Sequence, residues 1–280
     1  MDGILIINKE KDMTSRDVVD LAVKKLNTKK IGHTGTLDPL AEGVLVLAVN
    51  KGLKLVDDIT SLDKEYIAEV TLGIKTDTYD ITGTVLEEKE EHINKEDLIK
   101  VLNSFIGKYT MQVPIYSAVK VNGKKLYEYA RNNEKVELPI KEVYINSIEL
   151  LDFNDNKFTF KCNVSKGTYI RSLINDICNK LNVIGTMSNL KRTKQGKFLL
   201  EDSIDIKDIS EDKIIPIEQV LDIPTIEVDD FLYNKIKNGN KLENRYNYPK
   251  IVFTYNNKLI GIYIPDPKEE NKIKPKTIFV

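Results

Sequence analysis

A chain of 280 residues that is 41% hydrophobic and 30% charged can bury a sizeable core as one large domain, or as a domain with a small appendage. No apolar run approaches the roughly 20 residues of a membrane span, and the start MDGILIINKEKD does not read as a signal peptide, so we expect a cytoplasmic protein. The chain has only two cysteines and two histidines, which argues against a disulfide scaffold and a zinc site. It has no glycine-rich nucleotide motif, so no nucleotide cofactor is indicated, and a net charge of −1 does not by itself indicate a nucleic-acid partner.

The first fifty residues predict two buried strands around a helix and a polar loop. Residues 3–9 are apolar enough for a buried strand, and 15–27 carry apolar residues at helical spacing, with Ser15 as the expected N-cap. The loop GHTGTLDPLAEG (32–43) then leads directly into a purely apolar run, 44–49. A second buried strand is expected there.

The next segment predicts two strands and an amphipathic helix. Residues 66–74 alternate like a half-buried strand, and the polar, turn-rich loop at 76–83 precedes another strand at 84–90. Residues 94–107 have helical periodicity, with Asn94 as N-cap.

Strands and a second long helix follow in the second half. Residues 112–133 mix loop, turn and a short helix, and 143–164 predict two strands joined at an Asn/Asp turn. In KGTYIRSLINDICNKLN (166–182), Arg171 lies beside a clean apolar stripe that packs on a core. The stripe consists of Ile170, Leu173, Ile174, Ile177, Cys178 and Leu181.

The character of the chain changes from about Pro224. A short helix ending at Gly239 and a hairpin at 250–264 with an Asn-Asn turn predict a small β-rich module.

Local charge departs from the nearly neutral total. Basic runs occur at 24–30, 120–125 and 190–198, and an acidic run occurs at 86–97. Each basic run alone is most simply a solvated face, but three together are compatible with an asymmetric surface for nucleic acid.

The pair Asp38-Pro39 admits two interpretations. Asp is a favoured N-cap and Pro is favoured at the first helical position, so a short helical turn could begin here. Alternatively, Asp38 is a catalytic carboxylate beside a buried strand, and a cation keeps it ionised against desolvation. Arg171 is our candidate for that cation, because an arginine that points into a core usually pairs with a carboxylate.

Three further side chains also have two interpretations each. His33, between Gly32 and Gly35, is either a loop histidine bonded to backbone or a recognition side chain with backbone room around it. Tyr66 and Tyr169 are either amphipathic residues at the edge of the core or, in a nucleic-acid enzyme, platforms for an extruded base.

GHTGTLDPLAEGVL (32–45) resembles the signature of the TruB family of tRNA pseudouridine synthases. Four further segments resemble the family's other motifs in the family's order, and such an ordered set is far more specific than one motif. They are KEYIAEVTLGIKTDTYDITG (64–83), QVPIYSAVKVNGKKLYEYAR (112–131), SKGTYIRSL (165–173) and LKRTKQGKF (190–198). Departures include Asp12 and Asn133 at positions where the family usually has Gly.

The resemblance implies an α+β fold. Residues 1–223 would form the pseudouridine synthase fold, a central mixed and largely antiparallel sheet flanked by helices, with an RNA-gripping insertion around 110–142. Residues 224–280 would form a PUA-like module. The implied partner is tRNA, with no membrane, no metal and no cofactor, and we expect a monomer.

The resemblance also implies a role for each matched residue. Asp38 would be the catalytic aspartate, Arg171 its partner and Tyr66 the platform for a flipped uridine of the T-arm loop, position 55 in tRNA numbering. The remaining residues would bind substrate or RNA: His33, Tyr169, Leu190, Lys9, Lys120, Lys191, Arg192 and Lys194. Two alternatives stay open, a non-catalytic tRNA-binding or tRNA-folding protein and a pseudouridine synthase acting on another RNA.

Overall fold

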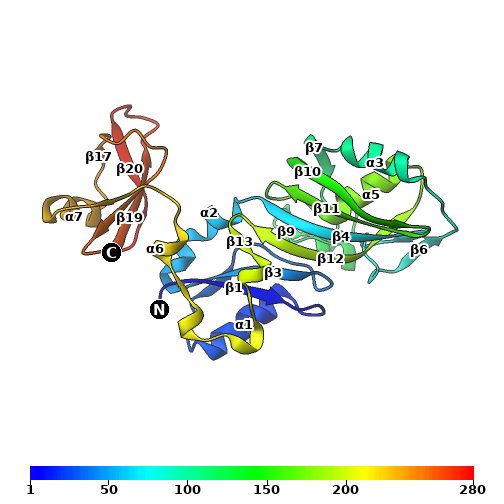
Figure 1. Ribbon diagram of the computed structural model, residues 1–280, viewed down its shortest axis with the longest axis horizontal. Coiled ribbons are helices and arrows are strands. Elements are labelled where there is room, and N and C mark those ends of the chain that lie inside the picture. The colour runs from blue at the N-terminus through cyan, green and yellow to red at the C-terminus, as the bar shows by residue number, and fades with distance from the viewer.

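The computed structural model describes residues 1–280 as two main β-sheets with helices packed on them (Figure 1). The larger sheet has eleven strands, and only the pairs β1–β14 and β3–β12 are parallel. Its main path runs in the order β14 (Ile204–Asp205), β1 (Gly3–Lys9), β3 (Glu42–Val49), β12 (Gly185–Gln195), β4 (Lys64–Leu72), β11 (Lys157–Val164), β10 (Ile140–Asn154) and β7 (Gly107–Gln112). Three short strands branch from it: β2 (Ile31–His33), β13 (Phe198–Leu199) and β15 (Ile215–Pro216). The expected α+β class and the mixed, largely antiparallel sheet are thus confirmed.

Strands β1 and β3 are buried on both faces, which explains their uninterrupted apolar sequences. In β3, Leu45 and Leu47 belong to the main core, whereas Val44 and Val46 belong to a second cluster on the opposite face. Burial of each such side chain contributes about 1.5–3 kcal/mol. An unpaired polar side chain within the apolar parts of these strands, residues 4–7 and 44–49, would therefore be costly.

Helices cover both faces of the large sheet. The main core takes side chains from α1 (Ser15–Lys25), α3 (Lys95–Asn103) and α5 (Ile170–Lys180). The second cluster takes side chains from the 3₁₀ helix η1 (Asn50–Leu55), from α2 (Val56–Thr60) and from α6 (Ile217–Val220). Three further 3₁₀ turns follow β13: Leu200–Asp202, Ile206–Asp208 and Glu211–Lys213.

The N-cap expected at Ser15 is wrong by one residue. Thr14 caps α1 in a capping box with Asp17, in which each side chain bonds the other residue's backbone N–H. Ser15 is the first helical residue, and its buried hydroxyl is free to bond elsewhere.

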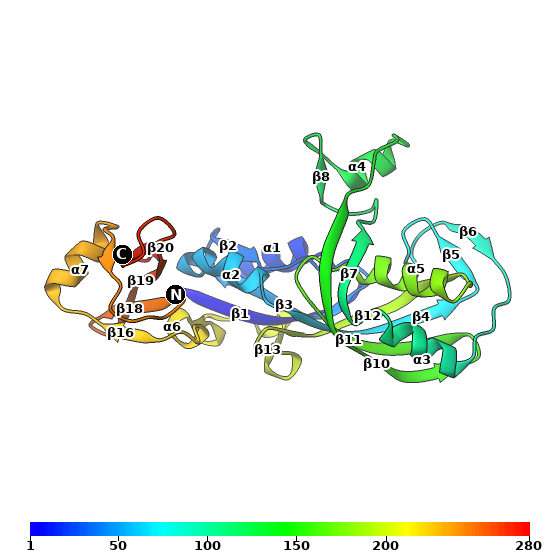
Figure 2. The same cartoon turned by 90° about the horizontal axis from the view of Figure 1, so that it is seen from above.

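Two small hairpins lie outside the main sheets. The first consists of β5 (Ile74–Thr76) and β6 (Val85–Glu88), and the second of β8 (Lys120–Val121) and β9 (Lys124–Lys125). The second hairpin and α4 (Leu126–Arg131) stand well away from the plane of the large sheet between β7 and β10 (Figure 2). This projecting segment occupies the place of the expected insertion.

The last 56 residues form a second sheet with its own apolar core. The hairpin expected at 250–264 is present, and Asn256 and Asn257 both have positive φ, as a type I′ turn requires. The sheet order is β16 (Thr225–Glu227), β18 (Ile251–Tyr255), β19 (Lys258–Pro265), β20 (Lys272–Ile278) and β17 (Leu242–Glu243), with α7 (Asp230–Lys237) packed on it.

None of the helices combines the length and hydropathy needed to cross a bilayer.

Candidate active site

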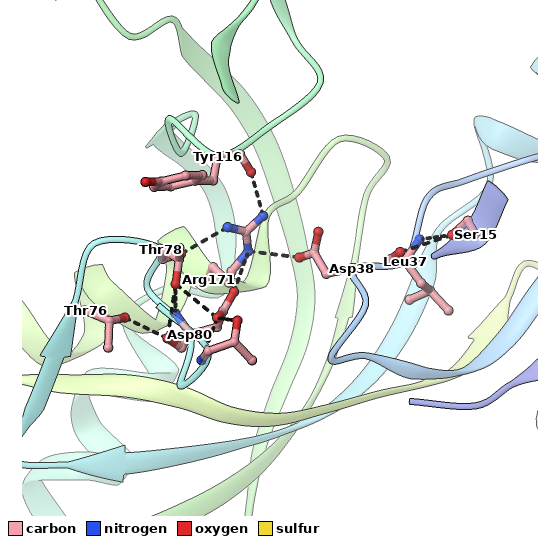
Figure 3. Close-up of polar contacts among 9 residues, drawn as sticks. Ser15, Leu37, Asp38, Thr76, Thr78, Asp80, Tyr116 and Arg171 are labelled. Atoms are coloured by element: carbon pink, nitrogen blue, oxygen red, sulfur yellow. Dashed lines mark hydrogen bonds and ion pairs between the residues drawn. The ribbon is translucent and has the colours of Figure 1, made fainter. Parts of the chain in front are cut away.

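The guanidinium of Arg171 joins three loops that are far apart in the sequence (Figure 3). Arg171 is 4% exposed and is the second residue of α5, at the edge of the apolar stripe. Its Nε lies 2.9 Å from Asp38 Oδ2, its Nη1 donates to the Thr78 carbonyl over 3.0 Å, and its Nη2 donates to the Tyr116 carbonyl over 3.0 Å. The expected Asp38–Arg171 pair is therefore present, within a larger clamp.

The N-cap interpretation of Asp38 is wrong. No helix follows Pro39, because β3 begins at Glu42 and leaves no room for one; the Asp38 carbonyl accepts only a turn bond from Ala41 N–H. The Asp38 carboxylate binds Arg171 through one oxygen and keeps 37% of its side-chain surface exposed. It is thus a fixed but accessible carboxylate.

Two buried side chains hold the loop that carries Asp38. The Ser15 hydroxyl accepts from Leu37 N–H over 2.8 Å and donates to the Leu37 carbonyl over 3.1 Å (Figure 3). Lys9 Nζ donates to the carbonyls of Glu10, Met13 and Pro39. The residue before Asp38 and the residue after it are thus both anchored.

Asp80 is a site residue that sequence reasoning did not single out. It is 6% exposed, and its Oδ2 lies 4.0 Å from Arg171 Nε. Its Oδ1 accepts from the Thr78 and Thr82 hydroxyls and from Thr82 N–H, which closes the loop between β5 and β6. The available signal was the density of Asp and Thr in TDTYDITG, because such side chains close loops on their own backbone.

Asp38 and Arg171 line a cavity of about 420 Å³. Tyr66 on β4 and Leu190 on β12 contribute apolar wall, with 8% and 5% exposure. Tyr169 also lines the cavity, and burial raises the pKa of its phenol. The projecting segment contributes Tyr127 to the same cavity, and the loop between β7 and β8 contributes Tyr116, Ser117 and Ala118. The structure therefore brings together Asp38, Tyr66, Tyr169, Arg171 and Leu190.

Lys9 and Arg192 are buried, unlike the other basic residues expected to contact RNA. They are 0% and 1% exposed, and their hydrogen bonds include backbone carbonyls of the loop around Asp38 and the start of β3. Lys9 does not line the cavity, whereas Arg192 does. Arg192 belongs to the basic run 190–198, and a basic run gives no sign that one of its side chains is buried.

His33 ends β2 and is not bonded to backbone through its side chain. Its Nδ1 is buried without a hydrogen-bond partner, and burial together with Arg192 and Arg16 lowers the pKa of the imidazole. A loop histidine satisfied by backbone is therefore wrong for this position. The ring is neutral at pH 7, which suits stacking or wedging better than phosphate binding.

The other expected RNA contacts have different surroundings. Lys120 is exposed on β8, Lys194 is half-buried on β12, and Lys191 Nζ lies 3.3 Å from Glu42 Oε1. No three His, Cys, Asp or Glu side chains approach one another closely enough to hold a metal ion.

Comparison with known proteins gives consistent matches. Residues 23–170 match the family model described as "TruB family pseudouridylate synthase (N terminal domain)". The chain is 42% identical over 301 residues to "tRNA pseudouridine synthase B" of Staphylococcus aureus (strain MSSA476), covering 99% of both chains. It is 41% identical over 286 residues to the protein of the same name from Caldanaerobacter subterraneus subsp. tengcongensis, covering 100% of this chain and 99% of that protein.

Solved structures match over nearly the whole chain. A chain in "Crystal Structure of a Cbf5-Nop10-Gar1 Complex" superposes with a TM-score of 0.75 at 24% identity, over 99% of this chain and 85% of that one. A chain in "Structure of H/ACA RNP bound to a substrate RNA containing 2'-deoxyuridine" gives a TM-score of 0.73 at 23% identity, with the same coverage. These likenesses show a shared fold.

Proposed function

The chain belongs to the TruB family of pseudouridine synthases, isomerases that convert uridine in tRNA to pseudouridine, and we propose that it acts on the T-arm loop uridine (position 55 in tRNA numbering) with Asp38 as the catalytic group. The reaction breaks the bond from C1′ to N1, turns the base and joins C1′ to C5. The C5 proton leaves and N1 takes up a proton, so that no atom is added or lost overall.

One observation carries the assignment of Asp38. Its carboxylate is held by Arg171 at 2.9 Å yet remains accessible in a cavity with aromatic and apolar walls. A carboxylate placed in this way can attack carbon or stabilise positive charge that develops on the sugar. The clamp on Arg171 fixes its direction before substrate arrives, so little reorganisation is required at reaction.

The walls of the cavity suit a base that has left its stack. We assign Tyr66 to stacking on the flipped uracil and Leu190 to a neighbouring apolar contact, with Tyr169 packing beside Arg171. Apolar contacts of this kind retain the base through buried area and not through directed hydrogen bonds. They therefore hold the base while still allowing it to turn between the two bond-forming orientations.

RNA outside the cavity would be recognised by shape and phosphate. Neutral His33 would wedge into the tRNA loop and stabilise the extruded state, and Lys120, Lys191 and Lys194 would contact phosphates. Residues 1–223 would be the catalytic domain and 224–280 a PUA-like module that adds grip. A monomer acting on tRNA in the cytoplasm is the simplest assembly consistent with this reading.

The test is tritium release from C5-tritiated uridine in an unmodified tRNA transcript. We expect release with wild-type protein and none with Asp38→Asn, while both proteins bind the transcript with similar affinity, because the substitution removes charge but little volume. Release by Asp38→Asn near the wild-type rate would refute the catalytic assignment.

An isolated T-arm hairpin separates the remaining possibilities. Turnover of the hairpin supports the position-55 assignment, since it offers no other tRNA feature. Turnover of another RNA but not the hairpin would mean a different target with the same chemistry. Tight binding to tRNA without any release would indicate a non-catalytic binder.

A further inference from the structure

Two buried cations that have no carboxylate partner line the cavity. Lys64 and Arg192 are 6% and 1% exposed. Neither has an Asp or Glu oxygen within 4.0 Å, whereas Arg171, the third cation of the cavity wall, pairs with Asp38. Buried charges are normally paired, so the cavity wall has an excess of positive charge near Lys64 and Arg192.

The hydrogen bonds of the two cations leave donors unused. Lys64 Nζ has three N–H groups and gives two of them, to the carbonyls of Thr60 at 2.5 Å and Leu62 at 2.6 Å. Arg192 gives Nε to the Val44 carbonyl and Nη2 to the Gly35 carbonyl, and its Nη1 makes no hydrogen bond to the protein. A ligand entering the cavity would therefore meet unbonded donors on both side chains.

Gly35 leaves the guanidinium of Arg192 uncovered. A Cβ at Gly35 would lie 3.5 Å from Arg192 Nη1, an ordinary contact, and the backbone of Gly35 does not adopt the left-handed conformation. Neither crowding nor conformation therefore requires glycine here. Its effect is to keep space open next to Nη1, as an approaching ligand needs.

The electrostatic environment agrees with an unfilled anion position. Burial, and then the nearby Arg192, lower the pKa of Lys64 to about 8. Arg192 also contributes to the lowered pKa of His33. An anion bound near Lys64 and Arg192 would offset the repulsion between the two cations.

We propose that Gly35, Lys64 and Arg192 form a phosphate subsite inside the cavity, which binds one of the two phosphodiesters that flank the target uridine. This inference rests on the proposed function, since it takes the target strand as the anion. It differs from surface phosphate binding by Lys120 or Lys194, because a buried subsite fixes one phosphate next to Asp38. The subsite would thereby set the position of the ribose relative to the carboxylate.

Lys9 provides a matched control for a buried lysine. Its Nζ also bonds only backbone carbonyls, but it uses all three donors, and Lys9 does not line the cavity. Replacement of Lys9 therefore tests the structural effect of losing a buried ammonium, including a looser loop around Asp38, without removing a donor from the cavity.

The experiment combines protein variants with neutralised phosphates. T-arm hairpins carry a single uncharged methylphosphonate either 5′ or 3′ of the target uridine, and dissociation constants are measured at several salt concentrations in an Asp38→Asn background that prevents turnover. The protein is unchanged elsewhere or carries Lys64→Met, Gly35→Ala or Lys9→Met. Thermal unfolding checks that each variant is folded.

At one of the two positions we expect the methylphosphonate to weaken binding about tenfold when Lys64 and Gly35 are present. In Lys64→Met and in Gly35→Ala the same methylphosphonate should weaken binding less than about twofold. The substitution and the methylphosphonate remove the same contact, so their effects on the dissociation constant do not add as independent free energies. Lys64→Met should also reduce the slope of log Kd against log salt by about 0.7–0.9. With Lys9→Met the full methylphosphonate effect should remain.

The inference is overturned if Lys64→Met and the methylphosphonate weaken binding independently, so that their fold-changes in affinity multiply, whether the methylphosphonate is 5′ or 3′ of the target uridine. It is also overturned if Lys64→Met binds the unmodified hairpin as tightly as its parent. Gly35→Ala keeps both cations, so it decides the matter should Lys64→Met fail to fold. Pseudouridine formation by wild-type protein on the unmodified hairpin is scored separately. Absence of product there would count against the proposed function and not against the subsite.

Discussion

Arg171 acts as a junction for three segments because its side chain is planar and offers donors in several directions. One face of the clamp is the Asp38 carboxylate and the others are two backbone carbonyls. The ammonium of a lysine bonds only acceptors that converge on one atom, as the three carbonyls around Lys9 do, whereas the acceptors of Arg171 are met by three different nitrogens. The residue type is therefore as important here as the charge.

Arg171→Lys should keep the charge next to Asp38 and still lose activity. We expect at least two of the three contacts to break and the pseudouridine-forming rate under single-turnover conditions to fall about a hundredfold, as for other misplacements near 1 Å. RNA affinity should change far less than the rate. A single-turnover rate equal to wild type would show that charge alone is sufficient.

His33 should make stability depend on pH in a defined direction. Burial lowers the pKa of His33 below its ordinary value of 6.5 in the folded protein, so between those two values the unfolded chain binds more protons. The free energy of unfolding should therefore fall as pH is lowered through 6.5.

In His33→Gln this component should disappear, while the other titrating groups remain. Urea unfolding at pH 7.5 and 5.5 gives the comparison, with His92→Gln as control because His92 is an exposed partner of Glu90. An identical pH dependence in His33→Gln and wild type would contradict the prediction.

The backbone conformation of two residues explains why they can replace the glycine that is usual in the family. Asp12 and Asn133 stand where the family usually has glycine, and both adopt positive φ, 64° and 52°. Asp and Asn are the residues that tolerate this conformation best after glycine. Both residues therefore adopt a backbone conformation that glycine also favours, which the sequence alone does not show.

At the scale of elements, the loop that carries Asp38 owes its position to α1. Ser15 was expected to cap the helix, and its hydroxyl instead closes two hydrogen bonds on Leu37. Thr14 takes over the cap, so one helix start performs two tasks with two adjacent residues. The sequence pattern could place Thr14 and Ser15 at the start of the helix. It could not show which of the two caps the helix and which one bonds Leu37.

Ser15→Ala should damage catalysis beyond its effect on stability. It leaves the buried Leu37 N–H without a partner, which costs about 1–3 kcal/mol and frees the loop next to Asp38. Thr14→Ala is the matched control, since loss of the cap costs about 1 kcal/mol without touching Leu37. We expect both to lower the melting temperature and only Ser15→Ala to lower kcat by tenfold or more. Equal kcat values in the two variants would contradict the role of Ser15.

Strands with apolar or alternating patterns were predictable, and β12 was not. Its sequence GTMSNLKRTKQ is mostly polar and was read as a basic run, yet Arg192 and Gln195 in it are buried. Both side chains donate to backbone carbonyls distant in sequence, such as those of Val44 on β3 and of Thr34. Such partners exist only after the chain has folded, so local patterning contains no trace of them.

At the scale of the whole molecule, the second sheet is seated on the large one. Phe279 is 2% exposed and packs in the cluster that contains Ile4 and Val44, and Lys51 Nζ donates to the Phe279 carbonyl. Asp58 on α2 adds an ion pair with Lys250 at 2.6 Å. The C-terminal residues thus fasten the module.

Phe279→Ala should loosen this junction specifically. The apolar loss is about 3–5 kcal/mol at a filled site, and we expect faster cleavage between residues 216 and 224 in limited proteolysis while the β1–β3 core stays protected. Phe231→Ala is the control, because Phe231 is 66% exposed on α7. Cleavage as slow as in wild type would show that the ion pairs and main-chain bonds hold the module without Phe279.

The order of strands in the large sheet has a consequence for how the protein is made. Strand β12, the last long strand of that sheet in the chain, lies between β3 and β4, and it is parallel to the first and antiparallel to the second. During synthesis, β3 and β4 therefore emerge from the ribosome well before the strand that joins them. Pairings this distant in sequence form slowly and leave apolar edges exposed in the interval. The cavity wall that includes Leu190 is thus completed only when translation has passed residue 195, so a nascent chain truncated before β12 should lack the complete cavity and should depend on chaperones until β12 inserts.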